Sequence, residues 1–342
     1  MRSSTRAFAS ARDGAEAVSE EAVITPAVPE AHPVSPGRRM VRTLLRKKLA
    51  VLALIYLSLF YFCGIFGPLL APQDPYEQNL SAETRLQGPS AEHWLGTDRL
   101  GRDIASRVVY ATRTTVVFTV VVLISGSLFL GLGLGLLAGY RGGWVDTLIM
   151  RVGEVMGGLP TLLLMLAITA AFRTRINGVS FWLEDHTWLG DDAATVTKFG
   201  IIVLATLPFA WIGSTRIVRS QALAIREEAY VLAAEAMGAG TWRVVSRHIL
   251  PGVMPLFIMG VSAGMAGTAG AEVTLSFLGL GIDPPTASFG SLIADGAGPQ
   301  TLERYPHLLL APAIPVALFF FAWNLLGDAL VDLLSPRGHL NG

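Results

Sequence analysis

The chain has 342 residues, of which 52% are hydrophobic and only 15% charged. Ordinary soluble domains carry roughly 25% charged residues, so this composition indicates a membrane protein. The formal net charge of zero gives no support to a nucleic-acid partner, and a single cysteine, Cys63, excludes both a disulfide framework and a thiolate metal cluster.

Residues 1–48 form an N-terminal tail that precedes the first apolar segment. Up to about residue 37 it is rich in Ala, Ser, Glu and Pro with little apolar periodicity, which predicts a largely disordered segment. The basic run that follows, from Arg38 to Lys48, directly adjoins the apolar segment. By the positive-inside rule this run places the N-terminus in the cytoplasm.

Six segments are long enough to cross a membrane, since a spanning helix needs about 20 apolar residues. They cover residues 49–71, 115–139, 147–172, 199–216, 252–280 and 307–331. We therefore expect an all-α membrane protein with a first transmembrane helix at 49–71 and an extracytoplasmic loop at 72–111. A transmembrane domain follows at 112–332. The remaining residues, 333–342, would form a cytoplasmic C-terminal tail.

The expected first outer loop contains the run H-W-L-G-T-D-R-L-G-R-D, at positions 93–103. Turn residues and paired charges are dense here, which predicts an ordered loop packed on the second span. Its candidate residues are Gly96, Thr97, Asp98, Gly101, Arg102 and Asp103. We expect Asp98, Arg102 and Asp103 to satisfy one another as a charged turn. We expect no metal there, because a few carboxylates without a histidine at ligand spacing make a weak site.

Glycines recur four residues apart at 131, 135 and 139, on an apolar segment. Because no strand or βαβ unit surrounds them, they favour close helix packing over dinucleotide binding. A tight inner turn is predicted at Gly142 and Gly143, followed by a kink at Pro160. No role is assigned to the region 173–198.

Residues 230–251 lie between the fourth and fifth spans. They read as a short helix, a glycine break at Gly238 and Gly240, a second short helix, and a proline where the next span begins. The candidate coupling residues are Tyr230, Val231, Leu232, Ala233, Ala234, Met237, Gly238, Arg247, Leu250 and Pro251.

The expected function of this elbow is docking. Val231, Leu232, Ala234 and Met237 would form an apolar plug for a partner's groove, with Arg226, Arg243 and Arg247 as a basic rim. The alternative is an amphipathic helix lying on the inner leaflet.

Three acidic residues fall inside expected spans, where charge is costly: Glu154, with Arg151, near the cytoplasmic start of the third span, and Glu272 and Asp328 in the last two. Glu272 either lines a pathway through the spans and meets the amino group of a passing molecule, or has a structural role by pairing with an arginine or capping a broken helix. Asp328 is interpreted as structural.

No catalytic, cofactor-binding or metal-binding residues are predicted. The six histidines form no H-E-x-x-H pattern, and no lysine completes a phosphate-binding G-x-x-x-x-G-K-[ST] loop. If transport is driven by ATP, the ATPase is another chain.

Several motifs resemble those of one family. The outer-loop run is similar to the H-x-L-G-T-D-x-x-G-R-D signature of peptide-importer permeases. Residues 230–251 resemble the EAA loop of ABC importer permeases, with matches at Ala233, Ala234, Gly238, Leu250 and Pro251, although Leu232 stands where the family has Glu. Segments 272–285 and 324–328 resemble the family's E-x-x-L-S-F-L-G-L-G and N-x-x-G-D blocks. Over about residues 40–337 the chain resembles the C-type membrane subunit of dipeptide, oligopeptide and nickel ABC importers.

This resemblance implies a type I ABC importer permease fold and a bacterial inner-membrane location with both termini cytoplasmic. It also implies partners: membrane lipid, a related second permease forming a heterodimer, two cytoplasmic ATPases and an extracytoplasmic solute-binding protein. The substrate would be a peptide, with nickel chelates or another small solute as the alternative. An ATPase-independent secondary transporter is the rival from another class, but it would show inverted repeats, and none is visible.

Overall fold

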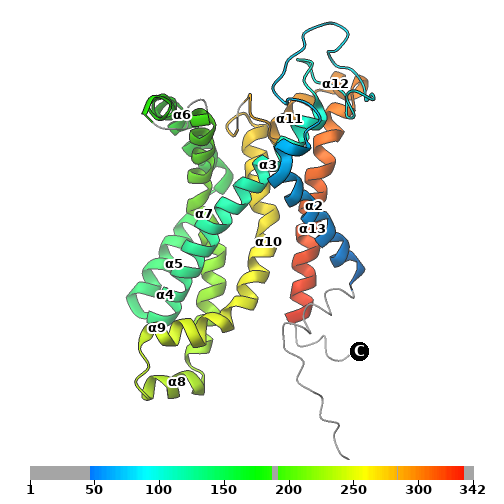
Figure 1. Cartoon of the computed structure of the whole chain (residues 1–342). Coiled ribbons are helices and arrows are strands. Elements are labelled where there is room, and N and C mark those ends of the chain that lie inside the picture. Colours follow the sequence, from blue (N-terminus) through cyan, green and yellow to red (C-terminus); the bar gives the residue numbers. More distant parts are fainter. Residues whose placement is uncertain (1–46, 187–191, 283, 335–342) are drawn as a thin grey trace, which may run out of the picture. The chain divides into compact units, whose positions relative to one another are not determined.

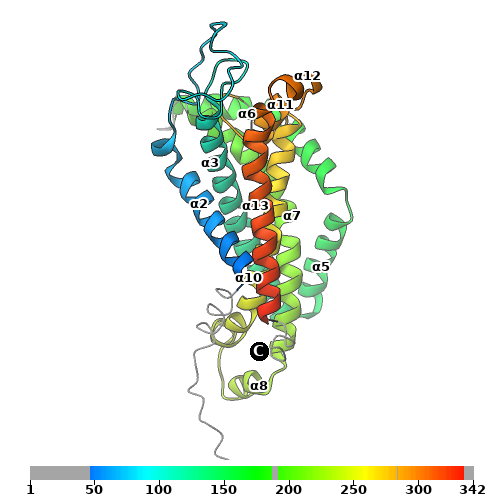
Figure 2. The ribbon, with the colours of Figure 1, turned by 90° about the vertical axis from the view of Figure 1, so that its right-hand side faces the viewer.

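The computed structural model describes residues 47–186, 192–282 and 284–334, so the predicted tails at 1–46 and 335–342 lie outside the described residues. The described part is built from helices (Figures 1 and 2). Their bounds are α2 Lys48–Leu70, α3 Ile104–Val122, η1 Leu123–Leu132, α4 Gly133–Arg141, α5 Gly143–Gly157, α6 Thr161–His186, α7 Asp192–Arg226, α8 Ala229–Ala236, α9 Thr241–Val244, η2 Val245–Ile249, α10 Leu250–Phe277, α11 Phe289–Gly296, α12 Pro299–Arg304 and α13 His307–Leu334.

Five of these helical stretches are long and apolar enough to cross a membrane. A sixth is added if α5 and the part of α6 up to Phe172 count as one span, because the two are bent by 86° at a break. The break falls at 158–160, where Pro160 lacks an N–H group and cannot continue a helix. The span predicted at 147–172 is therefore two helices at a steep angle, and the kink expected at Pro160 is much larger than a tolerated bend.

Two expected boundaries are wrong because helices continue past charged residues. The segment predicted as loop to residue 111 ends earlier, since α3 begins at Ile104 with Asp103 as its N-cap. The span predicted at 199–216 extends to Arg226. There Arg219 bonds to Asp146 of α5, with Nη2 and Oδ2 2.6 Å apart, so its charge is paired and does not end the helix.

Close helix packing explains the repeated glycines, as predicted. A Cβ added to Gly131, Gly135 or Gly139 would lie 2.5–2.6 Å from side chains of Ser214, Val218 and Ala222 on α7. These three glycines therefore let η1 and α4 approach α7 more closely than any side chain would permit. The predicted inner turn at Gly142 and Gly143 joins α4 to α5.

The largest apolar cluster joins α2, α3, α11 and α13. Phe60 of α2 lies 4.5 Å from Phe319 of α13 and 6.1 Å from Phe289 of α11, measured between ring centroids. A second cluster, centred on Val218, Val231 and Val253, secures α8 against α7 and α10. Figures 1 and 2 show α8 at one end of the long helices and α11 and α12 at the other.

Candidate functional site

The inner elbow consists of α8, α9 and the turn between them. Gly238 has φ of +86° and follows the last residues of α8, as predicted for a helix end that a side chain would resist. The N–H groups of Met237, Gly238 and Ala239 bond to carbonyls of Ala233, Glu235 and Ala234 at 2.9–3.0 Å. The backbone therefore makes a closed helix end, and the chain reverses there without help from any side chain.

The expected second short helix is not separate. α9 begins at Thr241 and runs without interruption through η2 into α10, so Pro251 lies within the first turn of a continuing helix. Proline lacks the donor for a helical hydrogen bond, and the wider π-helical turn of η2 just before it accommodates that loss.

The apolar plug divides into two halves. Val231 and Ala234 are buried against α7 and α10, whereas Leu232 and Met237 are exposed. A helix of 3.6 residues per turn sends positions 231 and 234 to one side and their neighbours to the other. Predicting all four as a docking plug was therefore wrong for Val231 and Ala234. Sequence reasoning missed Trp242, which is 81% exposed, close to the 83% of Met237.

The predicted basic rim is also only partly present. Arg243 and Arg247 are exposed, but Arg226 lies over the ring of Tyr140, with its guanidinium carbon 5.8 Å from the centroid. Tyr140 also donates a hydrogen bond to Glu235, at 3.1 Å. The bond from Tyr140 to Glu235 therefore holds α8 to α4, while Arg226 contacts α4 from the end of α7. Beside the exposed Arg243, the elbow presents four large exposed apolar or aromatic side chains, Tyr230, Leu232, Met237 and Trp242, which we call the knob.

The outer loop is ordered and packed on α3, as predicted, but its charges pair differently. Asp98 is 4% exposed and accepts bonds from Nε of Arg102 at 2.7 Å and from Nη1 of Arg107 at 2.5 Å. Its other oxygen accepts from the backbone N–H groups of Leu100 and Arg102, at 2.8 and 3.0 Å. One carboxylate thus organises the whole turn.

Asp103 does not join this charged turn, which corrects the expectation. Its Oδ2 accepts a bond from the N–H of Ser106 at 2.7 Å and caps α3, while Oδ1 lies 3.1 Å from Nδ1 of His93. A short polar side chain before a helix is the usual N-cap, and here that role outcompetes ion pairing with Arg102.

Backbone contacts fix the remaining residues of the loop. The N–H of Gln87 donates to Oγ1 of Thr97 at 2.9 Å, and the N–H of Thr97 donates to the carbonyl of Gln87 at 3.0 Å. Gly101 has φ of +71°, and a Cβ there would collide with the backbone carbonyl of Asn79. Gly96 is similarly close to Gln87. The small residues of this motif are thus sites of close backbone approach.

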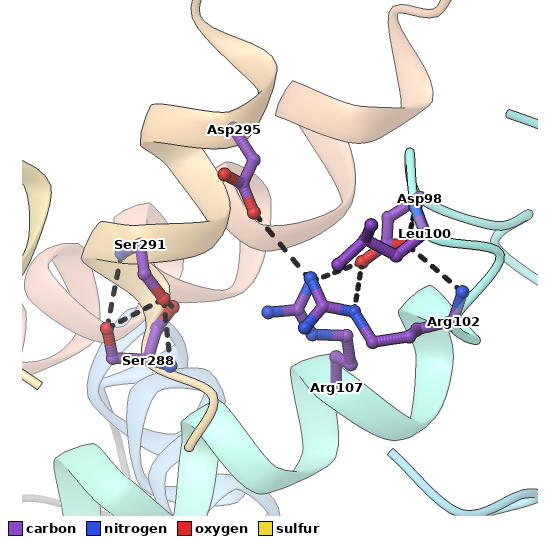
Figure 3. A network of polar contacts seen from close by, with 7 residues as sticks. All are labelled: Asp98, Leu100, Arg102, Arg107, Ser288, Ser291 and Asp295. Atoms are coloured by element: carbon purple, nitrogen blue, oxygen red, sulfur yellow. Dashed lines mark hydrogen bonds and ion pairs between the residues drawn. The ribbon is translucent and has the colours of Figure 1, made fainter. Parts of the chain in front are cut away.

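Arg107 was not predicted, although it completes the cluster. It is buried between the loop and α11, where its Nη1 lies 3.7 Å from Oδ2 of Asp295 (Figure 3). Burial raises the pKa of the Asp295 carboxyl above its ordinary value, and the attraction of Arg107 opposes that rise only in part. Arg107 stands nine residues after Asp98. The two residues come into contact because the loop folds back onto the start of α3, and the spacing alone does not predict this.

Glu272 is completely buried and pairs with no arginine among the described residues. Its two oxygens accept bonds from Thr115 of α3 at 3.1 Å and from Ser276 of its own helix at 3.0 Å. It lies inside α10, several residues before the helix end, so it caps no break either. The predicted structural partners were wrong; hydroxyl groups of α3 and α10 replace them.

Asp328, by contrast, is exposed and bonds to no other residue in the described ranges. One turn later, Asp332 accepts a bond from Lys47 at 2.6 Å. Across the described ranges, no group of three His, Cys, Asp or Glu residues lies close enough to hold a metal ion.

These features define a class: a multi-pass helical membrane protein with an ordered charged loop at one end and an exposed apolar elbow at the other. Comparison with known proteins identifies the family. Residues 131–338 match the binding-protein-dependent transport system inner membrane component family, and residues 35–89 match the N-terminal TM domain of oligopeptide transport permease C. The chain belongs to the binding-protein-dependent transport system inner membrane component family.

Individual relatives agree with this membership. The chain is 35% identical to the dipeptide transport system permease protein DppC of Alkalihalophilus pseudofirmus, over 89% of this chain and 91% of the relative. It is 33% identical to the glutathione transport system permease protein GsiD of Pectobacterium atrosepticum, over 89% and 92%. It is 31% identical to the oligopeptide transport system permease protein OppC of Bacillus subtilis, over 85% and 86%.

Proposed function

We propose that this chain is the C-type permease subunit of an ATP-driven importer for short peptides and forms half of its translocation pathway. Relatives that match it over most of their length carry names for dipeptide, glutathione and oligopeptide transport. Its proposed partners are a related second permease, two cytoplasmic ATPases and an extracytoplasmic solute-binding protein.

The observation that carries this proposal is the knob on the elbow. Four large side chains, Tyr230, Leu232, Met237 and Trp242, are more than half exposed on a segment that is itself firmly attached by Val231 and Ala234. Exposed large apolar groups on a rigid support are typical of a protein docking site, where they supply affinity once buried. A groove on the partner ATPase is the proposed receiver.

The charges around the knob bear on how the partner is oriented. Arg243 and Arg247 are exposed, but so are Glu227 and Glu228 just before α8. The rim therefore carries both signs, and a partner groove with complementary charges of both signs fits it better than a purely acidic one.

The proposed orientation puts both termini and the elbow in the cytoplasm. The Lys47–Asp332 ion pair holds the start of α2 next to the end of α13, which supports placing both on one side. Figures 1 and 2 draw α8 toward that same end of the helices. The basic run before α2 then satisfies the positive-inside rule.

Reconstitution tests this function. The chain is co-expressed with its candidate second permease and ATPases, incorporated into liposomes, and supplied with the binding protein and a radiolabelled dipeptide. We expect uptake that requires ATP and the binding protein, and no ATP hydrolysis by this chain alone. Uptake that persists without the ATPases, driven by an ion gradient, would contradict the proposal.

A further inference from the structure

Three charged side chains are exposed beside the break between α5 and α6. Nη1 of Arg151 lies 3.2 Å from Oε2 of Glu154, and the two side chains are 76% and 55% exposed. Arg216 of α7 is also exposed and makes no hydrogen bond or ion pair within the described part of the chain. Its Nη2 lies 3.7 Å from where a Cβ on Gly157 would stand, one turn after Glu154. We call Arg151, Glu154 and Arg216 the charged stripe.

Lipid is a poor neighbour for the charged stripe. Each charge at the centre of a bilayer costs about 2.5–3.5 kcal/mol even on the mildest insertion scales. Trp144, Leu148 and Val155 form an exposed apolar face on α5, and Arg151 lies on this face, three residues after Leu148 and four before Val155. Glu154 lies between that face and the α7 contact at Gly153, which packs on Trp211. Arg216 extends from α7 toward the same part of α5, at Gly157. Water or another polar group must therefore cover Glu154 and Arg216.

A pocket lies on α7 close to Arg216, and none of the three charged side chains is among its lining residues. Its volume is about 310 Å³, and η1, α6, α7 and α10 line it, with Ser127, Gly213, Ser214 and Gly264 among the lining residues. Gly213 precedes Arg216 by three residues, so both lie on the same side of α7. A Cβ at Gly213 or Gly264 would meet nothing within 4 Å. The pocket therefore has room for an added side chain at Gly213 or Gly264, whereas α7 occupies the space beside Gly135 and Gly139 of α4.

We propose that the charged stripe and this pocket form one wall of the peptide's path, with Arg216 binding the peptide's terminal carboxylate and Glu154 its terminal ammonium group. The inference rests on the proposed function and adds the substrate contacts to it. A guanidinium recognises a carboxylate through two parallel hydrogen bonds, and Arg216 has no other partner in the described residues. Arg151 holds one oxygen of Glu154 and leaves the other for the substrate.

The dimensions and polarity suit a short peptide in zwitterionic form. Small-molecule sites have volumes of roughly 300–1,000 Å³, and this pocket is at the lower limit of that range. Hydroxyls of Ser127 and Ser214 line it without a hydrogen bond to any described residue, so they are available to peptide groups or water.

Cysteine labelling in the assembled importer tests the proposal. Cys63, the only cysteine, is replaced by Cys63→Ala, and Gly213→Cys places a thiol in the open space of the pocket. The control is Gly133→Cys, because Gly133 also has nothing within 4 Å but lies two residues past Gly131, on the side of the helix away from α7. Two membrane-impermeant thiosulfonate reagents are compared, one anionic and one cationic.

We expect the Gly213→Cys thiol to react with both water-soluble reagents, and dialanine with its binding protein and ATP to slow the reaction. One unit charge a few Å away in water changes a local concentration about fivefold, so the anionic reagent should be favoured about fivefold over its reactivity in Arg216→Gln. The Gly133→Cys thiol should react only with a lipid-soluble maleimide.

Three results would overturn the inference. The thiol at 213 could react only with the lipid-soluble reagent, or it could form a disulfide with the second permease and resist both water-soluble reagents. It could also react with no dependence on Arg216 or dialanine. In each case ATP-dependent uptake by the Cys63→Ala importer remains, so the proposed function stands while the path assignment fails. Loss of the proposed function would appear instead as absence of that uptake in the unmodified importer.

Discussion

At the end of the helices that carries α11 and α12, Asp98 is buried and binds two buried arginines, whereas at the end that carries α8, Met237 and Trp242 are almost fully exposed (Figure 1). The outer loop is held by many polar bonds between segments distant in sequence, including Arg99 with Thr301 and Arg107 with Asp295. The elbow is held by the burial of Val231 and Ala234 and by a hydrogen bond from Tyr140 to Glu235. The contrast indicates a rigid scaffold at the first end, and at the other an exposed surface that fits the docking role we propose.

The difference has a physical basis in what each end must satisfy on its own. Buried charges require partners from the same chain, because leaving one uncompensated costs several kcal/mol. Exposed apolar groups of a docking surface need no internal partner, since their burial follows from assembly. Mutations at the outer end should therefore lower stability, and those at the inner end should lower coupling. We expect the loss in the free energy of folding to decrease in the order of substitutions at Asp98, Gly101, Gly238 and Lys47.

Removing the charge of Asp98 should have the largest effect on stability. Asp98→Asn leaves the buried Arg102 without a counter-charge and Arg107 with only the more distant Asp295, at a cost of about 3–5 kcal/mol. We expect little folded protein in detergent, measured by size-exclusion chromatography and thermal unfolding. Glu92→Gln changes an exposed carboxylate of the same loop and should behave as wild type. Equal stability of the two variants would contradict the scaffold role of Asp98.

The turn at Gly101 should be the next most sensitive position. Gly101→Ala forces a side chain into a left-handed conformation, which alone costs about 1–2 kcal/mol, and displaces Asn79 as well. Gly88→Ala is the matched control, because Gly88 lies in the same loop with nothing within 4 Å. We expect a lower unfolding temperature for the first variant only. Equal unfolding temperatures for Gly101→Ala and Gly88→Ala would contradict an ordered turn at Gly101.

At the elbow, Gly238→Asp should leave the protein folded but abolish uptake. The substitution strains the end of α8 by about 1 kcal/mol, because φ is +86° there, and so displaces Met237 from its position. Gly240→Asp is the control, since Gly240 has an ordinary φ and precedes α9, where aspartate is a favourable N-cap. ATPase stimulation and dipeptide uptake are measured for both. Normal uptake by Gly238→Asp would remove the coupling role from this turn.

The exposed Lys47–Asp332 pair should contribute least. Surface ion pairs are worth about 0.2–1 kcal/mol, and the Lys47 and Asp332 side chains are 36% and 69% exposed. Lys47→Ala should shift the unfolding temperature by no more than a few degrees and leave uptake unchanged. A severe loss of folded protein would show that this inner pair belongs to the scaffold, and the contrast between the two ends would no longer hold.

Much of the fold was accessible from sequence because membrane helices follow from hydrophobic length. The first and last spans were predicted closely, at 49–71 and 307–331, against α2 at Lys48–Leu70 and α13 at His307–Leu334. The start of α3 and the end of α7 were not, because these helices continue past the expected boundaries at 111 and 216 and include Arg107 and Arg219, whose charges are paired with Asp98 and Asp146.

The candidate sites were predicted as segments more successfully than as contacts. Gly238 predicted the end of α8 directly, because glycine is the usual residue where a helix ends with a positive φ. The division of the plug into buried Val231 and exposed Met237 depends on which face of α8 meets α7, which is a tertiary property. The partners of Asp103 and Glu272 were missed for a similar reason: serine, threonine and histidine from other turns satisfy them.

Site-specific crosslinking of the elbow tests its docking role most directly. In a Cys63→Ala background, Met237→Cys puts a thiol on the knob, and Val231→Cys puts one on the buried side of the same helix. We expect Met237→Cys to form efficient, nucleotide-sensitive crosslinks to an ATPase subunit, while Val231→Cys forms none. Labelling of Met237→Cys by lipid-soluble probes alone, with no crosslink to an ATPase under any nucleotide condition, would contradict that role.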